Sequence, residues 1–410
     1  LKENVYTRCV REDPNRKNLL YAGTETGVYV SFDNGDHWQS LQLNLPVTPV
    51  HDLQVKKDLQ ELVIATHGRG FWVLDDLTPL YQINDSMANA KQWLYQPRVA
   101  IRMEGKQLTE EKAAEIHLQE GTNAPNGMIV NYYFRQRPKG EIKLVFYTAA
   151  GDSIIAFSNK NDKHGNKLKG DDKFYKGPEK DTEVLTADSG MNRFVWDMNY
   201  PHTRLFDEEW WYNDALAGPK AMPGNYSVRL MKGDTLLMQK NFSIVLNPKV
   251  NATQTDLQAQ FDLMMQLNKE MNTITTSIIK IRSVREQVNG FTNSFGDSTK
   301  IKSLKAVAKP LLDSLKAIED TLIQVKAIAG EDVLRFPMQM IERMCALQDF
   351  IRSADSRPPM QQYEVVNVLT ARTNTYLKRL DAILLKQVRA FNVEVARLNL
   401  PVVDPARGLK

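Results

Sequence analysis

The chain has 410 residues, a net charge of +4 and 25% charged residues, the composition of an ordinary globular protein with two to four domains. Because Lys and Arg form no dense run, and no apolar run approaches the ~20 residues of a membrane span, we expect neither nucleic-acid binding nor a transmembrane segment. Two cysteines, Cys9 and Cys345, exclude a disulfide-stapled scaffold, and we favour two unpaired buried thiols over a disulfide between them.

Residues 1–80 carry short apolar segments separated by turn residues, which is the pattern of antiparallel strands. The segments form two pairs, each preceded by a further strand, and the unit repeats after about 40 residues. The predicted strands are 5–10, 19–23, 27–31, 50–55, 61–66 and 70–75. Several short strands per repeat are typical of propeller blades, so the region predicts two blades.

A hairpin turn is predicted within this region, where the sequence reads Ser-Phe-Asp-Asn-Gly-Asp-His-Trp. The pattern S-x-D-x-G-x-x-W is called an Asp box. Its Asp and Asn side chains can accept hydrogen bonds from backbone groups two residues on, its glycine supplies a positive φ, and its tryptophan can fold back under the turn. We therefore interpret four residues as structural: Ser31, Asp33, Gly35 and Trp38.

This Asp box, followed by ATHGRGFWVLDD at residues 65–76, resembles the closing blades of sortilin-type Asp-box (BNR) β-propeller proteins. The segments GMNRFVWD at residues 190–197 and GPKAMPGNYSV at residues 218–228 are similar to the tail of large bacterial members of that group, which are often labelled glycosyl hydrolase-like. The resemblance implies a partial propeller. A propeller typically needs four to eight blades and only about two fit here, so we interpret the chain as the C-terminal part of a longer protein.

Residues 81–127 are interpreted as a linker and an irregular segment. From residue 128 to residue 248 the pattern is β again, with polar insertions. The predicted strands are 128–134, 141–148, 153–157, 190–197, 224–232 and 236–245. Short strands at this spacing predict an immunoglobulin-like or fibronectin-like β-sandwich.

Residues 252–400 show apolar stripes at helical spacing. Thr253 begins a capping box, Asn289-Gly290 is expected to end the first helix, and Pro310 is expected to kink or restart the second. Pro337 suits the first turn of a shorter third helix, and a long fourth helix follows. Short loops between these helices predict an antiparallel bundle, so the fold class is multidomain and mixed.

The turn His67-Gly68-Arg69-Gly70 is the first place where we expect a ligand. Its glycines allow a sharp turn, so that His67 and Arg69 could project toward an anionic group. Asp75 and Asp76, which follow at the end of the next strand, are counted with them as candidate ligand-binding residues. The alternative is a blade turn in which Arg69 pairs with Asp75 or Asp76.

A second candidate is the aromatic pair Trp210 and Trp211, which follows Glu208 and Glu209. Aromatic rings can stack on sugars, but adjacent carboxylates point apart on a strand and make a poor acid/base pair. The alternative is a long loop whose tryptophans pack on a neighbouring domain. No zinc spacing, calcium loop or phosphate-binding loop is present, so we expect no metal and no cofactor, and we assign no catalytic residue.

Two functions remain open. The first is a non-enzymatic interaction module of an exported bacterial envelope or cell-surface propeller protein, located in the periplasm, at the outer membrane or at the cell surface. It would bind a protein or glycan partner, and its propeller would be completed in cis or by a second chain. The alternative is a glycoside hydrolase or carbohydrate-binding accessory whose active centre lies in blades outside this chain. Sialidases also carry Asp boxes on propeller blades, but this likeness of fold is only an analogy for function.

Overall fold

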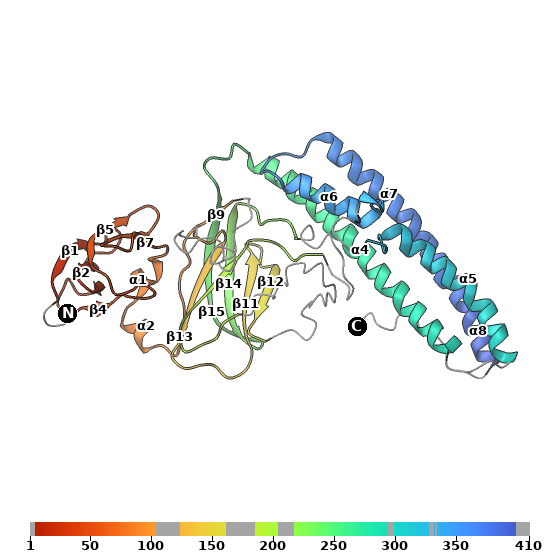
Figure 1. Ribbon diagram of the computed structural model, residues 1–410, viewed down its shortest axis with the longest axis horizontal. Helices are drawn as coiled ribbons and strands as arrows, with labels where there is room; N and C mark the ends of the chain where they lie inside the picture. The colour runs from red at the N-terminus through yellow and green to blue at the C-terminus, as the bar shows by residue number, and fades with distance from the viewer. Residues whose placement is uncertain are drawn as a thin grey trace. The chain divides into compact units, whose positions relative to one another are not determined.

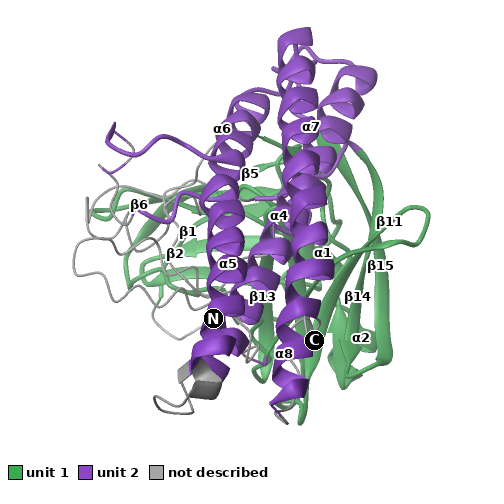
Figure 2. Ribbon diagram, turned by 90° about the vertical axis from the view of Figure 1, so that its right-hand side faces the viewer, with its two compact units in different colours: residues 1–159, 185–197, 224–245 green, residues 160–184, 198–223, 246–410 purple. Residues whose placement is uncertain are grey.

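The computed structural model describes residues 5–103, 124–160, 185–203, 217–293, 299–327, 332 and 334–398. The chain divides into two compact units, which Figure 2 colours separately. The first comprises residues 1–159, 185–197 and 224–245, and the second comprises residues 160–184, 198–223 and 246–410. The first unit is built from strands and two short helices, whereas the second holds the long helices.

The first unit begins with two antiparallel sheets, of strand order β1-β2-β3-β4 and β5-β6-β7 (Figure 1). Their strands are β1 (Thr7–Glu12), β2 (Leu20–Thr24), β3 (Gly27–Ser31), β4 (Gln39–Ser40), β5 (Val50–Lys56), β6 (Glu61–Thr66) and β7 (Phe71–Leu74). The six predicted strands are therefore present, and the first of them begins two residues later than predicted.

These two sheets share one hydrophobic core. Val50, Leu53 and Val55 of β5 are buried in it together with Tyr21 of β2. The backbones approach closely at Gly23, where an added Cβ would lie 2.8 Å from Val50 Cγ1 and 2.9 Å from the Val50 carbonyl oxygen. The contact between the two sheets therefore depends on a residue without a side chain.

Two further antiparallel sheets follow, one of order β13-β10-β8 and one of order β12-β11-β14-β15-β9. Their strands are β8 (Gln92–Leu94), β9 (Ala100–Arg102), β10 (Met128–Phe134), β11 (Ile142–Thr148), β12 (Ser153–Ser158), β13 (Gly190–Trp196), β14 (Gly224–Lys232) and β15 (Thr235–Leu246). An aromatic cluster joins the sheets: the Phe146 ring of β11 lies 4.4 Å from the Trp196 ring of β13, and Phe242 of β15 contacts both.

The segment that the sequence suggested to be a linker and irregular, residues 81–127, carries helices and strands in its described part. It carries α2 (Asp85–Asn89), just after α1 (Thr78–Gln82), and then β8 and β9. Strand β8 pairs with β10, and β9 forms the edge of the five-stranded sheet beside β15. Three-residue strands carry too little periodicity to be recognised in a sequence.

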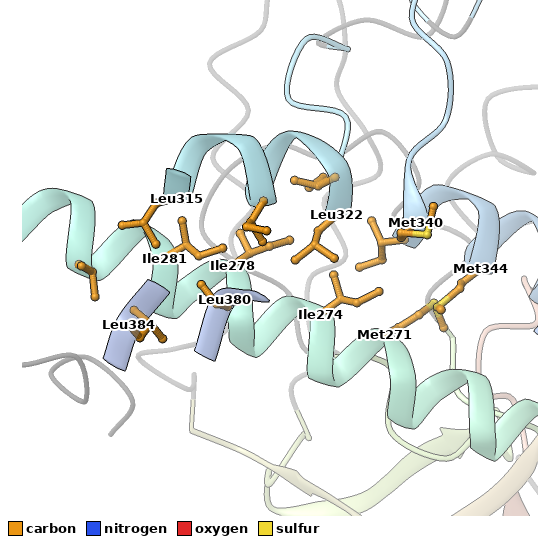
Figure 3. Close-up of a cluster of buried hydrophobic side chains, with 14 of the residues drawn as sticks. Met271, Ile274, Ile278, Ile281, Leu315, Leu322, Met340, Met344, Leu380 and Leu384 are labelled. Carbon is orange, nitrogen blue, oxygen red and sulfur yellow. The ribbon is translucent and has the colours of Figure 1, made fainter. Parts of the chain in front are cut away.

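The second unit is a helical bundle. Its helices are α4 (Gln254–Asn293), α5 (Thr299–Leu322), α6 (Met340–Arg352), α7 (Met360–Ile383), the π-helix η3 (Leu384–Val388) and α8 (Arg389–Arg397). Figure 3 shows part of its core, where Ile274 and Ile278 of α4 meet Leu322 of α5 and Met340 of α6. The apolar stripes of the sequence thus form the bundle's own core.

Helices α5 and α6 follow one another along α4, so that together they occupy one helical position of the bundle, which we call a leg. Glu319 of α5 contacts Arg282 of α4, Cys345 of α6 contacts Met271, and the Ile351 carbonyl accepts a hydrogen bond from Gln260. The residue numbers of the contacts rise along α5 and α6 while those of their partners on α4 fall, so both helices run antiparallel to α4. The described part of the bundle therefore has three legs: α4, then α5 with α6, then α7 with η3 and α8.

An ion network around a buried carboxylate connects α4 with α5. The Glu319 side chain is 3% exposed, lies 2.7 Å from Arg282 Nε and also contacts the Arg285 guanidinium, whereas both arginine side chains are partly exposed. Removing one member of such a network is costly because the other charges lose their partner.

Two predicted helix boundaries were wrong, and the helix restart that was one expectation at Pro310 does not occur. Helix α4 passes Gly290 and ends at Asn293, since Val288 lies in the core and Phe291 contacts Phe391. Helix α5 runs through Pro310, because core residues on both sides hold it in place, and α6 begins three residues after Pro337. Tertiary packing overrides local propensity at these positions. The capping box at the start of α4 is confirmed by reciprocal hydrogen bonds between Thr253 and Asp256.

The protein is therefore mixed, with several antiparallel sheets followed by a C-terminal helical region. Among the described helices, none combines the length and apolar character needed to cross a membrane. Both cysteines are free, as expected; Cys345 is buried, whereas Cys9 is only half-buried. Burial raises the pKa of the Cys345 thiol well above its ordinary value.

Candidate functional site

The turn between β3 and β4 is held by its own side chains. Ser31 Oγ accepts a hydrogen bond from the Gly35 N–H at 2.8 Å and donates one to Asp33 Oδ1 at 2.8 Å. Asp33 Oδ1 also accepts from the His37 N–H at 2.9 Å, four residues on rather than two as predicted. The Trp38 ring lies under the turn, 3.7 Å from where a Gly35 Cβ would be. These interactions hold the shape of the turn.

Asp33 and His37 form an exposed pair, with Asp33 Oδ2 2.6 Å from His37 Nδ1. Hydrogen bonds from the His37 backbone and ring lower the pKa of Asp33 to about 2, and the same carboxylate raises the pKa of His37. Ser31 donates to Asp33 rather than to His37, so the three residues do not form an activated serine.

The turn between β6 and β7 presents His67 and Arg69 at the surface. Gly68 and Gly70 have φ of 82° and 69°, a conformation that a glycine adopts freely. The backbone on either side of the turn is tied to the rest of the sheet: the Pro49 carbonyl accepts from the His67 N–H at 2.9 Å, and the Arg69 carbonyl accepts from Trp72 Nε1 at 3.0 Å. These hydrogen bonds hold the backbone of the turn in place, while the side chains of Arg69, a cation, and His67, which can become one, are exposed.

A second histidine lies beside this turn. The register of β5 against β6 shifts between Val50 and Asp52, as at a β-bulge, and the ring centroid of His51 lies 5.1 Å from that of His67. His51 is not recognisable as a site residue from the sequence, because the bulge that brings it to His67 does not change the pattern of apolar residues.

One face of the β5-β6-β7 sheet is buried and the other is open. Register places Leu53, Ile64 and Trp72 side by side on the face that packs in the core. The next residues along the strands form the opposite face, which we call the outer face: Asp52, Gln54, Val63, Ala65, Phe71 and Val73. On it, Phe71 is 79% exposed and Val73 is 56% exposed. A large aromatic side chain at this exposure is the unusual feature of the sheet.

Asp75 and Asp76, predicted as ligand-binding or as partners of Arg69, are used elsewhere. Both oxygens of Asp75 accept from Arg193, at 3.0 and 2.7 Å. Asp76 is buried and accepts from Thr78 Oγ1 at 2.6 Å and from Asn131 Nδ2 at 2.8 Å. The pairing of Arg69 with these carboxylates was therefore wrong.

These contacts give the two carboxylates a structural role. They link the end of β7 to β10 and β13 of the next sheets. Within the described part of the chain, the Arg69 side chain makes no hydrogen bond or ion pair, so it remains available to a ligand.

Trp210 and Trp211 lie outside the described residues, as do Glu208 and Glu209. Among the residues that are described, no three His, Cys, Asp or Glu side chains lie close enough together to hold a metal ion. The candidate site is therefore the outer face of β5-β6-β7, with His51, His67 and Arg69 at one end and Phe71 and Val73 along its edge.

Comparison with known proteins adds no identification. No protein-family model matches the chain, and neither the curated proteins nor the solved structures include a significant match.

Proposed function

We propose that this chain is a non-enzymatic interaction module that binds a protein β-sheet on the outer face of β5-β6-β7. The observation that carries the proposal is the exposure of Phe71 and Val73 on a sheet whose opposite face packs in the hydrophobic core. Burying two such side chains is worth about 1.5–3 kcal/mol each, before the costs of association. That is enough to contribute a central part of an interface.

The inner face of the same sheet indicates the class of partner. There, alternate apolar side chains pack against the β1-β2-β3-β4 sheet, as in stacked antiparallel sheets about 10 Å apart. The outer face offers the same alternation, with Val63 and Ala65 beside Phe71 and Val73. A further sheet could therefore stack on it in the same way. In addition, β7 is an edge strand, so its backbone could pair with a strand of the partner.

The resemblance to Asp-box propeller proteins supports this reading. In a propeller, each sheet packs between two neighbours, so a sheet with one open face is a blade whose neighbour is elsewhere. The partner sheet would then belong to the same longer protein or to a second chain. By the same resemblance, we propose an exported location in the bacterial envelope or at the cell surface, and a sandwich and bundle that support the propeller part.

Site-specific photocrosslinking in the native host tests the proposal. A benzophenone amino acid replaces Phe71 in one variant and Leu43 in a control, since Leu43 is 69% exposed but lies outside the outer face. We expect position 71 to crosslink to apolar residues of a β-strand, identified by mass spectrometry, and position 43 to give no such product. Equal products at both positions, or products at position 71 that map to no strand, would contradict the proposal.

A further inference from the structure

A groove runs along the outer side of the last leg of the bundle, in the second unit. Two rows of side chains spaced four residues apart form it: Leu384, Val388 and Asn392 in one row, and Leu385, Arg389 and Val393 in the other. Its volume is about 420 Å³. Rows of residues four apart are the ridges between which a second helix places its own side chains.

The floor of the groove lies on the π-helix η3, residues Leu384–Val388. Leu384 and Val388 lie in the bundle core, while Leu385 is exposed beside them. The floor of the groove is therefore apolar and held by the core.

The rim of the groove is apolar and exposed. Leu385 is 69% exposed and Val393 is 63% exposed, two turns apart on the same row. At ~1.5 Å per residue, the groove from Leu384 to Ala396 extends over about 18 Å, which is the length of three helical turns.

Two exposed cations lie within the groove's stretch of helix, residues 384–396: Lys386 and Arg389. The carboxylate in the same stretch, Glu394, pairs with Arg397. In the part of the chain that the structure describes, Lys386 and Arg389 form no ion pair. A partner with carboxylates beside its apolar stripe would supply the missing charge.

We propose that this groove binds an acidic amphipathic helix of another protein. The helix would place an apolar ridge between the two rows of side chains, with Leu385 and Val393 as its main contacts. Its Asp or Glu residues would pair with Lys386 and Arg389. This second surface lies on the other unit from the proposed sheet-binding face, and it does not depend on that proposal.

Fluorescence anisotropy with three labelled peptides tests the proposal on the full chain. Each peptide has about 18 residues, or about five helical turns. The first has Leu at positions i, i+3, i+4 and i+7 with Glu elsewhere, the second replaces Glu by Lys, and the third scrambles the first so that no apolar stripe remains. We expect the first peptide to bind at least about tenfold more tightly than the others, and its affinity to fall as salt is raised.

Variants of the chain locate the binding. Leu385→Glu and Val393→Glu should weaken binding of the first peptide by about tenfold or more, whereas Val368→Glu, an exposed valine on α7, should leave it unchanged. Arg389→Glu keeps the apolar floor and tests the charge alone; it should weaken binding and reduce its dependence on salt. Circular dichroism verifies that each variant retains its helices.

Four outcomes would overturn the proposal. The first two are equal binding of the acidic and scrambled peptides, and unchanged binding by the Leu385 and Arg389 variants. The third is binding of phosphatidylglycerol vesicles, but not of the acidic peptide, in a manner that depends on Arg389, which would make the groove a lipid surface. The fourth is a dimer that Leu385→Glu abolishes in sedimentation equilibrium, which would identify a second copy as the occupant.

Discussion

The Asp33–His37 pair makes the turn after β3 sensitive to pH in two directions. Because the pKa of Asp33 is lowered from 3.8 to about 2, its contribution to stability is present above pH 3.8 and is lost as the pH falls toward 2. Because the pKa of His37 is raised above 6.5, its contribution is complete below that pH and is lost as the pH rises through the raised value. The pair therefore stabilises the turn most between about pH 4 and 6.5.

We predict that the His37 imidazole titrates at a higher pH in the folded protein than in the unfolded chain. Proton NMR of the ring, in buffer and in concentrated urea, measures both values. An Asp33→Asn variant should bring the folded value down toward the unfolded one, since the amide carries no charge. A folded value equal to or below the unfolded one would mean that the pair does not form in solution.

Among the elements, the contact of β2 with β5 is set by a single glycine. A methyl group at Gly23 would lie 2.7 Å from Cys9 Sγ and 2.9 Å from the Val50 carbonyl oxygen, and the backbone cannot move aside as a side chain can. We predict that Gly23→Ala lowers the free energy of unfolding by about 1–3 kcal/mol. Cys9→Ala should not restore it, because the Val50 carbonyl remains in the way.

Gly290 in α4 is the matched control for this substitution. An added Cβ there meets nothing within 4 Å, and the residue is helical. Gly290→Ala should therefore raise the free energy of unfolding by about 0.5–1 kcal/mol. Urea denaturation of both variants gives the two values, and a loss of stability in both would show that the packing at Gly23 is not the cause.

Some of these elements can be predicted from the pattern of apolar residues alone, and others cannot. Strands β2, β3, β5 and β6 were predictable because each is a short segment rich in apolar residues that lies between turn residues. The shift of register at His51 was not, since a bulge adds one residue without changing composition. The joint between α5 and α6 was also invisible, because each helix has a normal stripe and only the contacts with α4 reveal that they share a leg.

At the scale of the molecule, each unit has its own hydrophobic core. Phe146 lies in the aromatic core of the strands, and Met344 lies in the core of the bundle. We predict that Phe146→Leu lowers hydrogen-exchange protection about tenfold or more in β11 and β14 and leaves α4 and α5 unchanged. Met344→Ala should do the reverse. A loss of protection spread evenly over both units by either substitution would contradict this assignment.

The candidate site was only partly predictable at this scale. The turn with His67 and Arg69 could be found from its glycines. The exposure of Phe71 could not, because it depends on which face of the sheet is covered, and the alternation of side chains does not identify that face. Asp75 and Asp76 appeared available in the sequence because their partners, Arg193 and Asn131, are 118 and 55 residues away.

The position of β9 beside β15 has a consequence for synthesis of the chain. Gln96, just before β9, donates to the Asn241 carbonyl across 145 residues. At ~5–20 residues per second, a ribosome needs about 7–30 s to make that stretch. During this interval β9 has no neighbouring strand, and its unpaired backbone is open to other chains. Slow translation or crowded polysomes should therefore harm this protein more than one whose strands pair with their immediate neighbours.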